Sequence, residues 1–401
     1  MHHHEAIDVG VERLQNVAEL EASWKELEAR AAHPFYLSWL WIGTWLRHLP
    51  KNAQPHVLTA RRAGKTVGLA VVCRRRAWSF GPRARARWFL NESGDARFDR
   101  LFIEHNKILA ERSSADAITV ACLKALIHRL HRSDQLVLSG IDPHLEATAS
   151  RIASQLGLIV DVKQANTAWR IDLSKVREKG GNYRAALGRH TRQAVTRSIR
   201  LYAERGPVEF RVTETPSQAL AAFDLLANFH QARWGHRGSF TYPSFRRFHE
   251  ELIARGVQVG AVRISRTLVG ERTIVVLYNF VHDGWVLNYQ SGFLYENDGR
   301  LKPGFVSHVL STEDSILRGE RGYDFLAGSA QHKPRLANAE YVLKWITVGG
   351  DSLERRVEAK VRSAKVLLWT LAANLRRAWL DLQPGPAKPA TVRAGRRVRT
   401  W

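Results

Sequence analysis

The chain has 401 residues, 45% of them apolar and 25% charged, which suffices for two domains and excludes a wholly disordered protein. Its 61 Lys and Arg outnumber 38 Asp and Glu, and the formal net charge of +23 favours anionic partners. Two cysteines exclude a disulfide framework, and no CxxC or HExxH spacing occurs, so no metal site is expected.

Membrane and export signals are missing from the sequence pattern. The longest apolar runs, such as LSWLWIGTWL, are well short of the roughly 20 residues that cross a bilayer. The amino-terminal stretch MHHHEAIDVG lacks the apolar segment of a signal peptide. Together with the two isolated cysteines, Cys73 and Cys122, which favour a reducing compartment, these features predict a cytoplasmic protein.

The first half of the chain predicts helices on either side of a short run of strands. In order, the expected elements are helices over 16–31 and 37–49, a hairpin over 56–76 turning at Ala63–Lys65, a strand over RFDRLFIE (97–104), a helix over 115–130 and a strand over 135–141.

A basic helix is predicted over residues 182–206, between the halves. At about 100° per residue, its arginines and its apolar residues fall on opposite sides. The basic side holds Arg189, Arg192, Arg197 and Arg200, and the apolar side holds Tyr183, Leu187, Ala194, Val195, Ile199 and Leu201. The basic side either binds the phosphates of a polyanion such as tRNA or is a solvated helix face.

The second half repeats the order of the first more clearly. Two helices (217–235 and 242–256) precede strands over 257–265, 272–281 and 285–293, with a turn over RTLVGE and an Asp-Gly hairpin turn at 282–284. A loop, a helix over 305–320 and a strand over 322–328 follow. This recurrence predicts a duplicated module.

The carboxyl-terminal region predicts one more strand over 341–350 and then a change of character. Residues 351–383 form a basic amphipathic pattern that either docks on the second domain or contacts a membrane surface. Residues 384–401, rich in Pro and Arg, predict a disordered basic tail.

Four motifs carry a resemblance to a known family: FHQARW (229–234), LNYQSGF (287–293), LKPGFVSHVL (301–310) and GYDFLAGSAQHK (322–333). In this order the second half resembles GNAT-superfamily acyltransferases of the CelD/BcsL type, which are related to Fem aminoacyl transferases. The resemblance implies an α/β (α+β) fold with tandem GNAT-like domains, each a mixed, mostly antiparallel sheet flanked by helices. The expected domains are a degenerate one over 1–165 and an acyltransferase domain over 166–350.

The helix that opens at Pro303 and Gly304 is the candidate cofactor site. Its first turn presents unpaired N–H groups and the positive end of the helix dipole, which suit a pyrophosphate. The alternative is a Pro-Gly helix start that binds nothing. With the resemblance, acetyl-CoA or another acyl-CoA is the expected cofactor, and its candidate contacts are Arg300, Lys302, Gly304, Phe305 and Val306.

The candidate catalytic residues lie on the two strands that splay apart in GNAT folds. Asp324 is the base that takes the nucleophile's proton, or a residue that orients the acceptor, or one partner of a structural ion pair with Lys333 or Arg335. Tyr289 is either a proton donor or a core residue. His332 stands where the family usually has Tyr, which puts a phenol-dependent mechanism in doubt.

Three further residues are candidates for substrate binding: Lys333, Gln290 and Trp234. Glu271 is a second carboxylate candidate, either on a middle strand or in a turn. The expected function is acyl-CoA-dependent transfer to an amine or hydroxyl, with a cell-envelope polysaccharide sugar as the acceptor that the resemblance suggests. A Fem-like aminoacyl-tRNA-dependent transferase and a non-catalytic nucleic-acid-binding protein on the same fold remain open alternatives.

Overall fold

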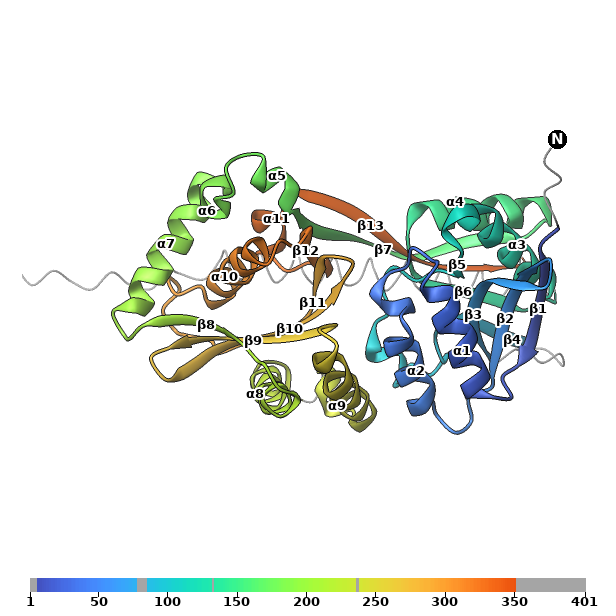
Figure 1. The fold of residues 1–401 in the computed structure, drawn as a ribbon, viewed down its shortest axis with the longest axis horizontal. Helices are drawn as coiled ribbons and strands as arrows, with labels where there is room; N and C mark the ends of the chain where they lie inside the picture. The colour runs from blue at the N-terminus through green and yellow to red at the C-terminus, as the bar shows by residue number, and fades with distance from the viewer. Residues whose placement is uncertain (1–5, 78–84, 132, 236–237, 351–401) are drawn as a thin grey trace, which may run out of the picture. The chain divides into compact units, whose positions relative to one another are not determined.

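The computed structural model describes residues 6–77, 85–131, 133–235 and 238–350 (Figure 1). The predicted basic amphipathic helix (351–383) and basic tail (384–401) lie outside the described residues. Within the described part of the chain, no helix is long and apolar enough to cross a membrane.

One sheet runs through the described residues in the order β1-β2-β3-β4-β6-β13-β7-β12-β11-β10-β9-β8, with β5 paired to β3. Its strands are β1 (Asp8–Arg13), β2 (Pro55–Arg62), β3 (Lys65–Ala77), β4 (Arg85–Leu90), β5 (Leu109–Ala110), β6 (Gln135–Ile141), β7 (Ile159–Asp172), β8 (Val208–Val212), β9 (Val262–Val269), β10 (Arg272–His282), β11 (Trp285–Phe293), β12 (Gly322–Ala327) and β13 (Ala339–Gly349). Neighbouring strands are antiparallel except for the pairs β4–β6 and β11–β12, which are parallel.

Helices cover both faces of the sheet in each half. They are α1 (Val17–Glu28), α2 (Trp39–His48), α3 (Ala115–His128), α4 (Pro143–Gln155), α5 (Leu173–Arg177), α6 (Tyr183–Ala186), α7 (Arg189–Ala203), α8 (Pro216–Trp234), α9 (Pro243–Gln258), α10 (Pro303–Leu317) and α11 (Lys333–Leu336). In the second half, α8 and α9 lie on one face of the strands and α7 and α10 on the other (Figure 1).

The two halves repeat one arrangement of strands. In the first half β2, β3 and β4 pair antiparallel, and α3 leads to β6, which pairs parallel with β4. In the second half β9, β10 and β11 do the same, and α10 leads to β12 beside β11. A parallel neighbour requires such a helical crossover. The predicted tandem fold of mixed, mostly antiparallel sheets is therefore confirmed.

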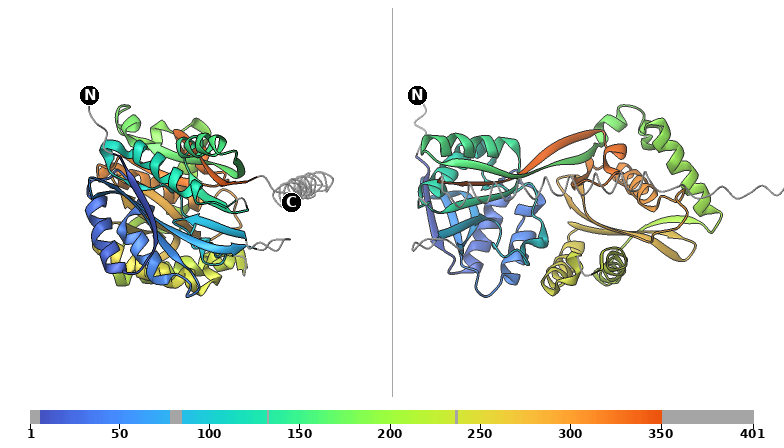
Figure 2. Two further views of the ribbon diagram at one scale, coloured as in Figure 1. Left: turned by 90° about the vertical axis from the view of Figure 1, so that its right-hand side faces the viewer. Right: turned by 180° about the vertical axis from the view of Figure 1, so that it is seen from behind.

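Two long strands join the halves through backbone hydrogen bonds (Figures 1 and 2). Strand β13 pairs with β7 from Ala339↔Arg170 to Gly349↔Ile159, and its last residues also pair with β6. Strand β7 in turn pairs with β12 at Gly322↔Asp172. One ladder therefore runs from the first half into the strand that was expected to carry catalysis.

An aromatic cluster also packs the halves together. Phe35 stacks on Phe280 with ring centroids 4.1 Å apart, and Trp41 meets Phe248 edge-on at 4.9 Å. Phe35 and Trp41 belong to the first half, whereas Phe280 and Phe248 belong to the second, and all four are buried. Burial of large aromatic surface is a strong packing term, so the first half is fixed against the second-half strands.

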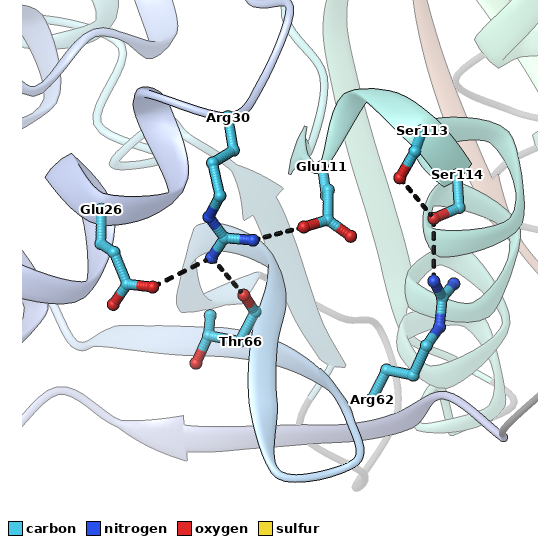
Figure 3. Close-up of polar contacts among 7 residues, drawn as sticks. All are labelled: Glu26, Arg30, Arg62, Thr66, Glu111, Ser113 and Ser114. Atoms are coloured by element: carbon cyan, nitrogen blue, oxygen red, sulfur yellow. Dashed lines mark hydrogen bonds and ion pairs between the residues drawn. The ribbon is translucent and has the colours of Figure 1, made fainter.

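Arg30 anchors the end of α1 in the first half (Figure 3). Its guanidinium donates to the carbonyl of Thr66 on β3 at 3.1 Å and pairs with Glu26 at 3.2 Å and with Glu111. The same side chain thus connects a helix, a strand and the segment before α3. These charged hydrogen bonds hold α1 over β3.

Two predictions based on the strand pattern were wrong. Residues 97–104 form no strand: Asp99 accepts hydrogen bonds from Ser93 N (2.9 Å) and Oγ (2.7 Å), which stabilises a loop and a short 3₁₀ turn. The strand that lies between β3 and β6 in the sheet is β4, which comes earlier in the sequence. The stretch RTLVGE is only partly a turn, because β9 runs to Val269 and the turn is Gly270–Glu271. Glu271 is exposed there.

The predicted basic helix is present but broken. Helix α6 ends before Leu187, and Gly188 caps the start of α7. Val195 and Tyr202 are buried on one side, and the predicted basic residues are exposed on the other: Arg189, Arg192, Arg197 and Arg200. The division into a buried and a basic side is confirmed.

Candidate functional site

Strands β11 and β12 pair for only three residues before they separate. The pairs are Trp285↔Gly322, Val286↔Tyr323 and Leu287↔Asp324. Beyond them β11 carries a bulge at Tyr289, and the register of β12 against β7 shifts between Asp324 and Ala327. A bulge bends its strand and re-aims its side chains. The gap that the resemblance implied between these two strands is therefore present.

A cavity of about 830 Å³ opens at this gap and reaches the start of α10. It is bounded by the end of α8, by β11, by the loop before α10 and by the segment 329–333. Eight of the sequence-predicted site residues line it: Trp234, Tyr289, Gln290, Lys302, Gly304, Phe305, His332 and Lys333. Residues far apart in the sequence thus meet around one space, whereas Asp324, Arg300 and Val306 are not part of its lining.

The first turn of α10 faces the cavity through its backbone. The first i→i−4 bond of this helix runs from Val306 N to Lys302 O at 3.1 Å, so the amides of Gly304 and Phe305 precede it. A side chain at Gly304 would meet the Phe293 ring, since a Cβ there would lie 3.2 Å from it. The two amides and the Lys302 ammonium can accept an anion close to the backbone.

Two other predicted cofactor contacts point elsewhere. Arg300 donates to both oxygens of Asp298, at 3.0 and 2.8 Å, and this pairing raises the pKa of the exposed guanidinium further. The Val306 side chain is fully buried in the core. The α10 site therefore consists of backbone amides and Lys302, with Arg233 across the cavity.

Asp324 is buried and held by neutral donors. It is 3% exposed, accepts from Leu326 N at 2.7 Å, and accepts from the Tyr341 hydroxyl at 2.9 and 3.0 Å. Burial raises the pKa of Asp324 to about 6, although these hydrogen bonds oppose the shift. Since the Tyr341 proton is donated to Asp324, the 2.9 Å bond between Tyr341 and His105 has Nε2–H of His105 as its donor.

Lys333 satisfies the backbone at the end of β12. Its ammonium donates to the carbonyls of Ala327 at 2.7 Å and Leu326 at 3.2 Å. Leu326 has a positive φ of 59°, which costs a residue with a Cβ some strain. Asp324 accepts from the amide of this strained residue, and Lys333 donates to its carbonyl. Both side chains therefore support the register shift of β12 that keeps the gap open.

Glu104 is a site residue that sequence reasoning missed. It comes from the first half, is 9% exposed, and accepts a hydrogen bond from Ala327 N at 3.0 Å. Burial raises the pKa of Glu104 to about 7, and the charge of Asp324 adds to this shift while the Ala327 amide and Lys333 oppose it. No local signal could have found it, because its contact spans 223 residues of sequence and its segment resembled an ordinary strand.

A second cavity of about 330 Å³ adjoins the first. Both cavities are lined by Asn288, Tyr289, Gln290, Phe325 and Lys333, which are residues of the separated strands and the segment after β12. The smaller one is completed by residues from the first half and from the connecting strands: Phe102, Glu104, Gln164, Asn166 and Trp345. The gap therefore separates two spaces that different ligands can occupy.

The Tyr289 hydroxyl is already engaged. It donates to the carbonyl of Leu101 at 2.6 Å and lies 3.2 Å from Nε2 of His249. Burial raises the pKa of Tyr289 well above its ordinary value. The ring lines both cavities, but the hydroxyl proton bonds to the first half, so Tyr289 joins the halves at the gap.

His332 lies against a second histidine at the cavity wall. Its ring stacks on that of His308 with centroids 4.9 Å apart and an interplanar angle of 19°. Burial lowers the pKa of His332 to about 4, and the charge of Lys333 lowers it further. The ring is therefore neutral at pH 7 and cannot bind phosphate as a cation.

Trp234 is half-exposed at the cavity edge. Arg233 lies over its ring at 5.1 Å and over the Tyr295 ring at 4.2 Å. This aromatic-cation stack offers flat surfaces to a planar group. Among the described residues, no group of three His, Cys, Asp or Glu could hold a metal ion.

Residues 189–334 match the family model described as an acetyltransferase (GNAT) domain, so this part of the chain is a GNAT-type acetyltransferase domain. The solved structure of FemX is 11% identical, covers 88% of this chain and 100% of its own, and has a TM-score of 0.50. At this identity the likeness shows a shared fold.

Two further solved structures are similar at lower TM-scores. L-PGS from Bacillus licheniformis is 8% identical over 88% of this chain and 96% of its own, with a TM-score of 0.48. A tandem GNAT protein from the clavulanic acid biosynthesis pathway is 13% identical over 86% of this chain and 100% of its own, with a TM-score of 0.43. No curated protein matches this chain. The CelD/BcsL assignment stays a prediction.

Proposed function

We propose that this protein is an acyl-CoA-dependent acyltransferase that acts on an amine or hydroxyl acceptor. The observation that carries the proposal is the cavity of about 830 Å³ that joins the β11–β12 gap to the first turn of α10. It offers an anion site at one end and unpaired strand edges at the other, within a GNAT-type domain.

Each part of the donor would meet a matching part of the cavity. The Gly304 and Phe305 amides and Lys302 would bind the pyrophosphate. The open edge of β11 beyond Leu287 would pair with the extended acyl arm, as an added strand does. The bound cofactor supplies the thioester, and the chain orients its carbonyl at the gap between the two cavities.

Two observations bear on the proposed acceptor. The CelD/BcsL resemblance supports a sugar of a cell-envelope polysaccharide, and the polar side chains around the gap, Asn288 and Gln290 among them, suit a hydroxyl-bearing ligand. The predicted roles of Asp324, Tyr289 and His332 become positioning roles in this proposal. Asp324 supports the register shift of β12, Tyr289 joins the halves, and neutral His332 packs the cavity wall.

The test is calorimetric titration of acetyl-CoA into the wild type and into Gly304→Trp. The indole would cover the two amides, so saturable binding should be lost in the variant. Gly188→Trp is the matched control, because Gly188 is likewise a glycine at the start of a helix but has open space around it and a φ of −55°. Wild-type protein that is folded and binds no acyl-CoA would refute the proposal.

A second candidate, a Fem-like aminoacyl-tRNA-dependent transferase, is favoured by one observation. The exposed arginines of α7 form a basic surface, and Ser198 of α7 accepts a hydrogen bond at 2.8 Å from the amide of Lys302, which lines the cavity of about 830 Å³, the donor cavity. The same protein is also titrated with tRNA. Binding of tRNA that weakens steeply with salt, together with no binding of acyl-CoA, would select this candidate or a non-catalytic nucleic-acid-binding protein.

A further inference from the structure

The smaller cavity, unlike the donor cavity, is lined by a carboxylate from the first half of the chain. Its carboxylate, Glu104, belongs to the first half of the chain and reaches β12 at the point where the strands separate. The Ala327 amide donates to Oε2, which leaves Oε1 without a hydrogen-bond partner among the described residues. A side chain nine-tenths buried thus presents a free acceptor atom to a cavity.

The charges around this cavity favour a cation. Asp324 lies near two cations, the Arg170 guanidinium and the Lys333 ammonium, whereas the only cation acting on Glu104 among the described residues is Lys333, whose donors are directed to two backbone carbonyls. Tyr289 and Tyr341 are neutral because burial raises their pKa values, and His105 is neutral because burial lowers its pKa to about 4. Among the described residues Lys333 therefore makes no hydrogen bond to Glu104, and a buried carboxylate with a free oxygen is stabilised by an opposite charge that reaches it.

We infer that the smaller cavity is the acceptor site, that its ligand is a primary amine, and that Glu104 is the residue that takes the amine's proton. The inference rests on the proposed acyl-CoA-dependent function. It assigns the first half of the chain a catalytic part in place of the degenerate role expected from its sequence.

The reaction balances with these groups. The acceptor enters as an ammonium and gives one proton to Oε1 of Glu104. The nitrogen lone pair then forms a bond to the thioester carbonyl carbon, the carbon–sulfur bond breaks, and the leaving thiolate takes the second nitrogen proton. Glu104 returns its proton to solvent. A carboxylate that titrates near neutral pH suits this task.

The surrounding side chains suit a polar amine. Gln164 and Asn166 lie two residues apart on β7 and so share a face, and Asn288 stands opposite on β11. Phe102 and Trp345 provide apolar surface at the same cavity. Amides flanked by aromatic rings can bind both the hydroxyls and the carbon faces of a small polar molecule.

Glu104→Gln separates catalysis from structure. The glutamine side-chain carbonyl can still accept from Ala327 N, so the link to β12 is kept while the charge and the proton acceptor are lost. Glu340→Gln is the matched control, since Glu340 is an exposed carboxylate on β13. Acetyl-CoA binding is measured first by calorimetry and is expected to be equal in all three proteins.

Transfer is then measured as thiol release from acetyl-CoA, with two amines and their hydroxyl counterparts as probes: glucosamine against glucose, and putrescine against 1,4-butanediol. The amines should react and the alcohols should not. Glu104→Gln should lower kcat about 100- to 10,000-fold, with the rise of wild-type activity between pH 6 and 8 lost. The control should match the wild type.

Three outcomes would overturn the inference. The first is acetyl-CoA binding by wild-type protein without reaction of either amine. The second is preference for the alcohols. The third is a Glu104→Gln variant with wild-type kcat and pH profile, which would leave Glu104 a purely structural link. Wild-type protein that binds no acetyl-CoA would instead refute the proposed function on which the inference rests.

Discussion

The pH dependence of stability offers a sensitive test of the environment of Glu104. Burial moves its pKa from 4.5 to about 7 in the folded protein. A carboxylate with a raised pKa contributes stability that is fully present below the unfolded pKa and is lost as pH rises through the folded one. The wild type should therefore become less stable relative to Glu104→Gln between pH 5 and pH 8.

The size of this change follows from the two pKa values. The relative stability lost is about 1 kcal/mol at pH 5 and about 3 kcal/mol at pH 8, because each pKa unit is worth about 1.4 kcal/mol. The difference between wild type and Glu104→Gln should thus shift by about 2 kcal/mol in favour of the variant. Asp324 and Lys333 titrate in both proteins, so most of their contribution cancels in this difference.

The assay is urea unfolding at pH 5, 6, 7 and 8 for wild type, Glu104→Gln and the exposed control Glu340→Gln. Stability is taken from the linear dependence on denaturant. The control should follow the wild type at every pH. A constant difference between wild type and Glu104→Gln across the series would refute the buried, high-pKa carboxylate and with it the charge argument for the smaller cavity.

Two further variants test what holds the site in place. Tyr341→Phe removes the hydroxyl that donates to Asp324 at 2.9 and 3.0 Å and leaves a buried carboxylate with fewer hydrogen bonds. Urea unfolding should show a loss of about 1–3 kcal/mol in the free energy of unfolding. An unchanged midpoint would mean that water replaces the hydroxyl. Phe35→Ala removes the ring stacked 4.1 Å from Phe280, and it should lower the free energy of unfolding by about 3–5 kcal/mol and weaken acyl transfer. The same change at exposed Phe102 should lower stability much less. Equal stability losses in the two Phe variants would contradict the packing of the halves.

The second-half fold could be predicted because its signals are local. The Asp283–Gly284 turn fixes the β10–β11 hairpin, since both residues have the positive φ that this turn type requires. Pro303 and Gly304 mark the start of α10, and the alternation of aromatic residues marks β12. These patterns placed most of the donor cavity without any knowledge of long-range contacts.

The rest of the site depends on contacts that no local pattern encodes. Glu104 reaches Ala327 only because β7, β13 and the aromatic cluster hold the halves together. Asp324 was expected to act directly or to form an ion pair, but it is bonded by Leu326 N and the Tyr341 hydroxyl. Arg300 has the right charge for a phosphate, yet its neighbour Asp298 occupies it. Each of these roles is set by tertiary partners.

The most direct measurement is a crystal structure of the protein with acetyl-CoA. The proposed function predicts the pyrophosphate at the amides of Gly304 and Phe305 and the thioester between β11 and β12, where both cavities are lined by Asn288 and Lys333. A cofactor bound elsewhere on the chain, or an unchanged cavity at saturating acetyl-CoA, would contradict it.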